Sequence, residues 1–204
     1  MQTGDCRKAA MSVDSVGLMT MLETMNATIT HWVFGYGSLI WNPGFAHISA
    51  QQGLLYGAHR SLSVYSQDHR GTPQRPGLVF GLTRGGSCRG MMFEVADADW
   101  GRVRAYLLAR EKGNGVYREA TRPVRLADGR AVLALTFMVD ERHVQYARNL
   151  SLEHQLAIVR GGVGESGNNV DYVLNTARGL AQLGIEDRQI MALAKLLARD
   201  VAAA

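Results

Sequence analysis

The stretch Trp32-Val33-Phe34-Gly35-Tyr36-Gly37-Ser38-Leu39 says more about the fold than any other part of the chain. Its three leading apolar residues favour a buried strand, and the glycines after them indicate a tight turn. Gly35 and Gly37 can adopt positive φ, so we expect successive backbone N–H groups to converge there on an anion. The aromatic residues Tyr36 and Trp41 at this turn favour a ligand pocket.

Further strand-like segments lie downstream of this turn, at residues 54–56, 62–65, 78–82, 90–95, 117–126 and 131–139. Gly85-Gly86-Ser87 is predicted as a turn between two of them. Asp128-Gly129 between the last two segments is a strong signal for a β-hairpin.

Helical patterns interrupt the strands once and then complete the chain. Asp97 or Asp99 can cap a helix that carries Trp100, Val103, Tyr106 and Leu107 on one face. Ser151, Asn169 and Asp187 are predicted to start three more helices, the first over residues 152–159. Strands that come first and helices that gather at the end predict a mixed α/β (α+β) domain. Its sheet should be largely antiparallel and able to curl into a barrel.

Composition narrows the possible functions. The 204 residues, 47% of them apolar and 20% charged, fit one globular domain. A net charge of +4 comes from arginines spread along the chain, which suits an anionic small substrate and indicates neither nucleic-acid binding nor membrane binding. Two cysteines exclude a disulfide scaffold, and we expect a cytoplasmic protein.

The first thirty residues differ from the rest in being polar and rich in methionine. They lack the arrangement of a signal peptide. We expect residues 1–30 to be a mobile N-terminal extension with a short helix at 16–25 and a free thiol at Cys6. Residues 31–204 then form the functional domain.

Few side chains are good candidates for chemistry. The run Gly162-Val163-Gly164-Glu165-Ser166-Gly167-Asn168-Asn169 lacks the lysine of a phosphate loop and is predicted to connect two helices. Ser38 is not in a nucleophile elbow, Cys88 is expected to be a buried inert thiol, and the histidines show no metal-ligand spacing. Glu111 at a helix end is a surface residue by default, but burial would raise its pKa and make it a general base.

Several motifs occur together in a characteristic order: residues 33–45, Asp68-His69-Arg70-Gly71-Thr72-Pro73 with Pro76-Gly77, Arg110-Glu111 with Gly115 and Tyr117, Tyr146, and residues 163–169 running into Asp171-Tyr172-Val173-Leu174. In this combination they resemble the ChaC-type, glutathione-specific γ-glutamylcyclotransferases over roughly residues 31–197. One position departs from the family pattern, because Val116 stands where the second glycine of Gly-Gly-Tyr is usual. This departure bears on the geometry of the loop and on the range of substrates.

The resemblance implies a γ-glutamylcyclotransferase-like fold, a small mixed β-barrel with surrounding helices. It also implies a lyase that splits glutathione into 5-oxoproline and cysteinylglycine without a metal or other cofactor. Glu111 matches the catalytic glutamate. The positions implied to bind substrate are Tyr36, Gly37, Ser38 and Leu39 of the glycine-rich loop, together with Arg70 and Tyr146.

Two alternatives remain at this level. One is a cyclotransferase for other γ-glutamyl amines or dipeptides, and the other is a non-catalytic regulator that binds a ligand in the same pocket. A binder has no need of a base, so Glu111 favours an enzyme. The oligomeric state cannot be read from the sequence.

Overall fold

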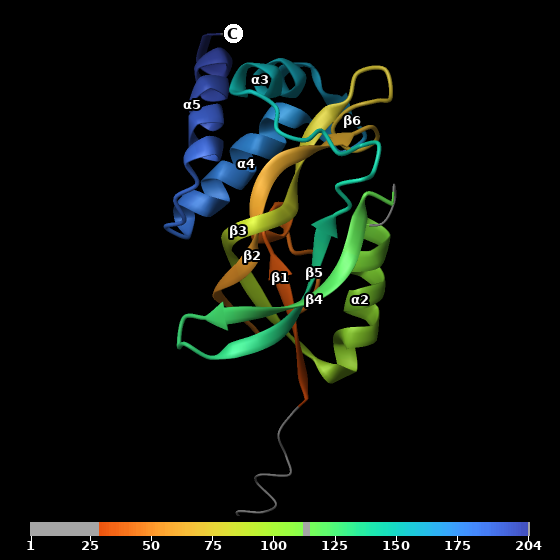
Figure 1. Ribbon diagram of the computed structural model, residues 1–204, viewed down its shortest axis with the longest axis vertical. Helices are drawn as coiled ribbons and strands as arrows, with labels where there is room; N and C mark the ends of the chain where they lie inside the picture. Colours follow the sequence, from red (N-terminus) through yellow and green to blue (C-terminus); the bar gives the residue numbers. More distant parts are fainter. Residues whose placement is uncertain (1–28, 112–114, 204) are drawn as a thin grey trace, which may run out of the picture.

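Strands β1 to β5 close into a barrel in the computed structural model, which describes residues 29–111 and 115–203 (Figure 1). They are β1 (Thr30–Gly35), β2 (Ser49–Ser66), β3 (Gly77–Ala96), β4 (Tyr117–Leu126) and β5 (Ala131–Val139). Their order is β1-β3-β2-β4-β5, and parallel pairing of β1 with β5 completes the ring. The other main pairings are antiparallel, so the predicted mixed barrel is confirmed.

The longest antiparallel pair of the barrel is formed by β2 and β3. The prediction of several short strands in this region is wrong. Four of the short predicted strands are parts of these two long ones, and residues 85–87 are not a turn. Gly85 and Gly86 have φ of +90° and +68° inside β3, opposite Gly57 at +79° in β2. The register shifts at this point, so the glycines form a bulge that bends the ribbon without ending it.

The hairpin of β4 and β5 follows its prediction. Gly129 has φ +88° in the turn, and Arg125 pairs with Ala131 on either side of it. The barrel interior is filled by apolar side chains from its strands, among them Phe34, Leu55 and Met92.

The helices cover two parts of the barrel (Figure 1). Helix α2 (Asp97–Glu111) packs Val103 and Leu107 against residues of β1, β3 and β5. Helices α3 (Leu152–Gly161), α4 (Asn169–Gln182) and α5 (Arg188–Ala203) share a second core with Leu62 and Leu78. Residues at the carboxyl end of α2 and in the first turn of α4 line the same cavity.

The predicted helix starts are confirmed at two places and shifted at a third. The Ser151 hydroxyl accepts the His154 N–H, and Asp187 accepts the Ile190 N–H. Asn169 is not a cap: Asn168 caps α4 by accepting the Asp171 N–H. The buried Asn169 side chain bonds instead to both the N–H and the C=O of Leu78, because a side-chain amide matches a strand's backbone pair.

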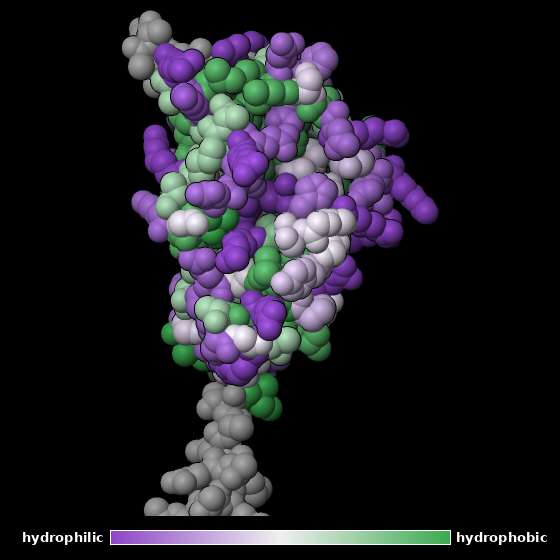
Figure 2. Space-filling model, turned by 60° about the vertical axis from the view of Figure 1, so that its left-hand side comes forward, coloured by the Kyte–Doolittle hydropathy of each residue, from purple (hydrophilic) through white to green (hydrophobic). Residues whose placement is uncertain are grey.

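The predicted extension, its helix at 16–25 and Cys6 lie outside the described residues, so the boundary at residue 30 stays a prediction. None of the helices in the described part of the chain combines the length and apolar character that a bilayer crossing needs. On the face shown in Figure 2, hydrophilic side chains are spread widely and hydrophobic ones form small groups among them.

Candidate active site

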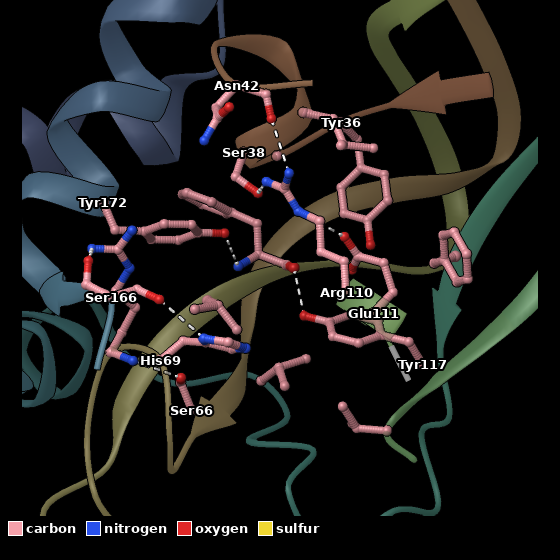
Figure 3. Close-up of a pocket in the computed structure, with 18 of the residues that line it drawn as sticks. Tyr36, Ser38, Asn42, Ser66, His69, Arg110, Glu111, Tyr117, Ser166 and Tyr172 are labelled. Atoms are coloured by element: carbon pink, nitrogen blue, oxygen red, sulfur yellow. Dashed lines mark hydrogen bonds and ion pairs between the residues drawn. The ribbon is translucent and has the colours of Figure 1, made fainter. Parts of the chain in front are cut away.

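A cavity of about 540 Å³ lies between the barrel and the helices. The described residues that line it come from the end of β1 and the segment after it, the end of β2 and the loop after it, β3, the last two turns of α2, the start of β4, β5, Ser166 and the first turn of α4. Its size is typical of a small-molecule site. Figure 3 shows polar side chains from the loop after β1, the end of β2 and the loop after it, α2, β4 and α4 converging on one space.

The glycine-rich loop forms one wall, but its glycines serve a purpose that differs from the prediction. Gly37 has φ −124°, and Gly35 ends β1 without a positive φ. A Cβ on Gly35 would lie 2.8 Å from the Cβ of Leu39, and one on Gly37 would face Tyr172. Close packing, not a left-handed turn, therefore requires glycine at position 35, whereas a Cβ at position 37 would make only ordinary contacts at 3.6 Å.

The loop continues into a short 3-10 helix, η1 (Ser38–Ile40). The first N–H groups of such a helix have no acceptor within the helix, so those of Ser38 and Leu39 can meet an anion. Leu39 itself is buried and anchors the turn in the barrel core.

A buried arginine supports this loop from the barrel side. The Arg60 guanidinium donates from Nε to the Tyr36 carbonyl and from Nη2 to the Arg89 carbonyl, both at 2.5 Å. Its Nη1 lies 3.1 Å from the carboxylate of Asp187, the residue that starts α5. The start of the last helix is thus connected to the glycine-rich loop through one side chain.

A second arginine ties the loop to helix α2 (Figure 3). Arg110 donates from Nη2 to the Ser38 hydroxyl at 2.9 Å and from Nη1 to the Asn42 carbonyl at 3.0 Å. Its Nη1 also lies 2.7 Å from the hydroxyl oxygen of Tyr106. Arg110 therefore fixes the end of α2 against the loop and lines the cavity.

Glu111, the last residue of α2, lines the same cavity. Its side chain is 17% exposed, and its Oε1 lies 3.7 Å from the Arg110 Nε. Burial raises the pKa of the Glu111 carboxyl, and the neighbouring guanidinium opposes that rise without cancelling it. The surface location that is usual for such a glutamate does not apply here.

Three tyrosines surround the middle of the cavity. The Tyr117 hydroxyl donates to the Phe80 carbonyl at 2.9 Å, and the Tyr172 hydroxyl accepts the Phe80 N–H at 3.1 Å. Burial raises the pKa of Tyr36 and Tyr117 well above the usual range, and the nearby Glu111 carboxylate adds to the effect. Both phenols therefore stay protonated: the Tyr117 proton is shared with the Phe80 carbonyl, and the Tyr36 hydroxyl is a hydrogen-bond donor that lines the cavity with the carboxylate.

The position that departs from the family pattern is part of the cavity wall. Gly115 has φ +72°, a conformation that favours glycine, whereas Val116 is 3% exposed. The Val116 side chain packs with Val64 and Val139 and lines the cavity. The valine side chain therefore fills space at the site, next to the glycine turn at position 115.

The opposite end of the cavity is built from the loop after β2. His69 and Arg70 line it there, and both contact the short hairpin of β6 (Val163–Gly164) and β7 (Gly167–Asn168). The Glu165 N–H donates to the Asp68 carbonyl and the Ser166 N–H to the His69 carbonyl. The second glycine-rich run is thus a hairpin that supports this loop, which agrees with the absence of a phosphate-loop pattern.

The cavity brings together most of the residues that the sequence suggested. Glu111, Arg70 and the four loop residues 36–39 all line it. Tyr146 is not among the described residues in its lining. It forms a backbone bridge with Val64, and its side chain packs against the Val64, Val116 and Val139 cluster.

Sequence reasoning did not single out Arg110, Tyr117 and Tyr172 as site residues, although all three stand in the motifs that carry the family resemblance. The pattern offered one signal, the direct adjacency of Arg110 to Glu111. Nothing in the local sequence indicates that the two tyrosines meet at Phe80.

The barrel, with its cavity between loop and helix end, is the fold of γ-glutamylcyclotransferases. A solved yeast γ-glutamyl cyclotransferase specific to glutathione matches with a TM-score of 0.77 at 21% identity, over 83% of this chain and 96% of that one. At this identity the likeness concerns the fold alone.

The family follows from the sequence comparisons. The model of the ChaC-like protein family matches residues 31–200, and the chain belongs to that family. A glutathione-specific γ-glutamylcyclotransferase of Escherichia coli is 30% identical over 173 residues, which are 83% of this chain and 75% of the relative. One from Schizosaccharomyces pombe is 29% identical, over 83% of this chain and 92% of its own. The predicted resemblance is confirmed.

Proposed function

We propose that this protein is a glutathione-specific γ-glutamylcyclotransferase that releases 5-oxoproline and cysteinylglycine. The observation that carries the proposal is the buried carboxylate of Glu111, which lines one cavity with the glycine-rich loop at residues 36–39. The named activities of the E. coli and S. pombe relatives support it. The two-cysteine composition is consistent with action in the cytoplasm.

The substrate contains its own nucleophile. The α-amino nitrogen of the γ-glutamyl group attacks the γ-carbonyl carbon, a five-membered ring forms, and the bond to the cysteinyl nitrogen breaks. The protein must hold the amine and carbonyl about 3–3.5 Å apart and manage the protons. In our proposal, the N–H groups at Ser38 and Leu39, with Arg110 beside them, hold the α-carboxylate of the γ-glutamyl part.

Glu111 is the proposed base and acid. An α-amino group has a pKa of about 8, so at neutral pH it must lose a proton before it attacks. A carboxyl with a raised pKa accepts that proton more readily, and the protonated form then donates it to the departing cysteinyl nitrogen. The buried phenol of Tyr36, which lines the cavity, provides a donor for the charge that develops nearby.

The test is Glu111→Gln, which keeps the shape of the side chain and removes the base. We expect kcat with glutathione to fall by about 100-fold or more, because general-base catalysis contributes about that much. Release of 5-oxoproline, followed by chromatography, is the readout, and circular dichroism confirms the fold. A folded variant with near-normal turnover would exclude this role. Release of 5-oxoproline from γ-glutamylalanine as fast as from glutathione would exclude the specificity.

A further inference from the structure

The cavity has a cationic group at each end. Arg110 lies beside Glu111 and Ser38, whereas Arg70 lies at the opposite end, where its Nη1 contacts the Ser166 carbonyl. Figure 3 shows Tyr36, Arg110 and Glu111 on one side of the space and His69 with Ser166 on the other. Glutathione also has two separated anionic groups, the α-carboxylate of its γ-glutamyl part and the carboxylate of its terminal glycine.

The guanidinium of Arg70 is held in place by the protein. Nη1 donates to the Ser166 carbonyl and, at 3.2 Å, to the Asn168 carbonyl. Its Cζ lies 5.3 Å from the centroid of the Tyr172 ring, which provides a cation–π contact. These contacts use one nitrogen and one face of the group.

The remaining edge of Arg70 is available. Among the residues that the structure describes, none accepts a hydrogen bond from its Nε or Nη2. Nε and Nη2 are two parallel donors on one edge of a guanidinium, the arrangement that binds a carboxylate through both oxygens. A preorganised arginine with this edge free, on the wall of a cavity, is suited to a carboxylate ligand.

We propose that Arg70 binds the terminal carboxylate of the γ-glutamyl peptide through Nε and Nη2, so that this end of the cavity selects peptides with a free C-terminus over γ-glutamyl amines. The inference rests on the proposed function and names the group that its substrate must carry. His69 adds a ring nitrogen at the same end. Asp68 also lines the cavity, and its negative charge opposes anion binding, so the paired donors of Arg70 must outweigh it.

The experiment compares glutathione with its glycinamide analogue, which has the same length but no terminal charge. The wild-type protein should prefer glutathione in kcat/KM by about tenfold to a hundredfold, the range of a charge-assisted bidentate pair. Arg70→Gln should bring this preference close to one. Arg75→Gln, in the same loop but exposed and not among the described cavity-lining residues, makes the same change of charge and should keep the preference.

The ratio separates binding from structure. If Arg70 only supports the β6–β7 hairpin, its loss should lower kcat/KM for both substrates equally and leave the preference for glutathione intact. That result would overturn the proposal. Equal use of the two peptides by the wild-type protein would overturn it as well. If Arg70→Gln does not fold, Arg70→Lys keeps the charge but not the paired donors and should lower the preference at least about threefold. An unchanged preference in that variant overturns the proposal.

A second experiment separates this inference from the proposed function: the dissociation constants of glutathione and of its glycinamide analogue for the Glu111→Gln variant are measured by calorimetry. If the wild-type protein releases no 5-oxoproline from glutathione, the proposed function fails. The carboxylate site would still be established if Glu111→Gln binds glutathione more tightly than the glycinamide analogue and if this difference disappears when Arg70→Gln is added. Equal binding of the two peptides would overturn it.

Discussion

Removing the charge of Arg110 should move the pH profile of the enzyme. The Arg110 Nε lies 3.7 Å from Glu111 Oε1, and both side chains are mostly buried. The guanidinium favours the ionised carboxylate, so the Glu111 pKa, already raised by burial, should rise further in Arg110→Gln. Because a base must be deprotonated, the acidic limb of kcat/KM should shift to higher pH.

The size of this shift can be bounded. Unit charges at this separation attract by about 4–5 kcal/mol at an effective dielectric of about 20, which is an upper limit of about 3 pKa units. Opposite charges this close shift a carboxyl pKa by about 1–3 units. Water that enters the space left by Arg110 reduces the effect, so we expect a rise of about 1–2 units.

The assay is the pH dependence of kcat/KM for glutathione, with an NMR titration of the Glu111 carboxylate as the second readout. Arg110→Lys is the matched control, since it keeps the charge but lacks the fork that reaches both Ser38 and Asn42. It should lower kcat/KM while the limb moves by less than about half a unit. An acidic limb that stays in place in Arg110→Gln would refute the electrostatic reasoning.

Three further substitutions test the supports of the site. Val116→Ala should lower the free energy of unfolding by about 2 kcal/mol in urea titrations, because buried methyl groups are lost from the cavity wall. Asn169→Ala should lower it by about 2–4 kcal/mol, since the N–H and C=O of Leu78 lose their side-chain partner. Arg60→Met should cost about 3 kcal/mol by leaving Asp187 without its cation, and it should raise KM for glutathione because the Tyr36 carbonyl loses its donor.

Each substitution has an exposed counterpart. Val144→Ala, at a side chain that is 86% exposed, should change stability by less than about 0.5 kcal/mol. Asn168→Ala removes only a helix cap and should cost about 1 kcal/mol. Arg118→Met breaks an ion pair whose arginine is 71% exposed and should cost less than about 1 kcal/mol. Equal losses in a variant and its counterpart would contradict the assignment of that support.

Local patterns predicted the elements whose signals are local. The Asp128-Gly129 hairpin and the helix that starts at Ser151 appear as expected, since each depends on neighbours within a few residues. The glycines at 85 and 86 were misread as a turn, because positive φ suits a bulge as well as a reversal. The choice between the two is made by the long pairing of β2 with β3.

The sequence by itself determined the class of fold, the family and the identity of the candidate base, because motifs in a given order and a helix that ends at Glu111 are properties of the chain. Only the tertiary structure decided that this carboxylate is buried, that Arg110 joins the end of α2 to the glycine-rich loop, and that Arg70 occupies the far end of the same cavity. Burial and hydrogen-bond partners are set by segments about forty to a hundred residues apart. No local pattern contains them.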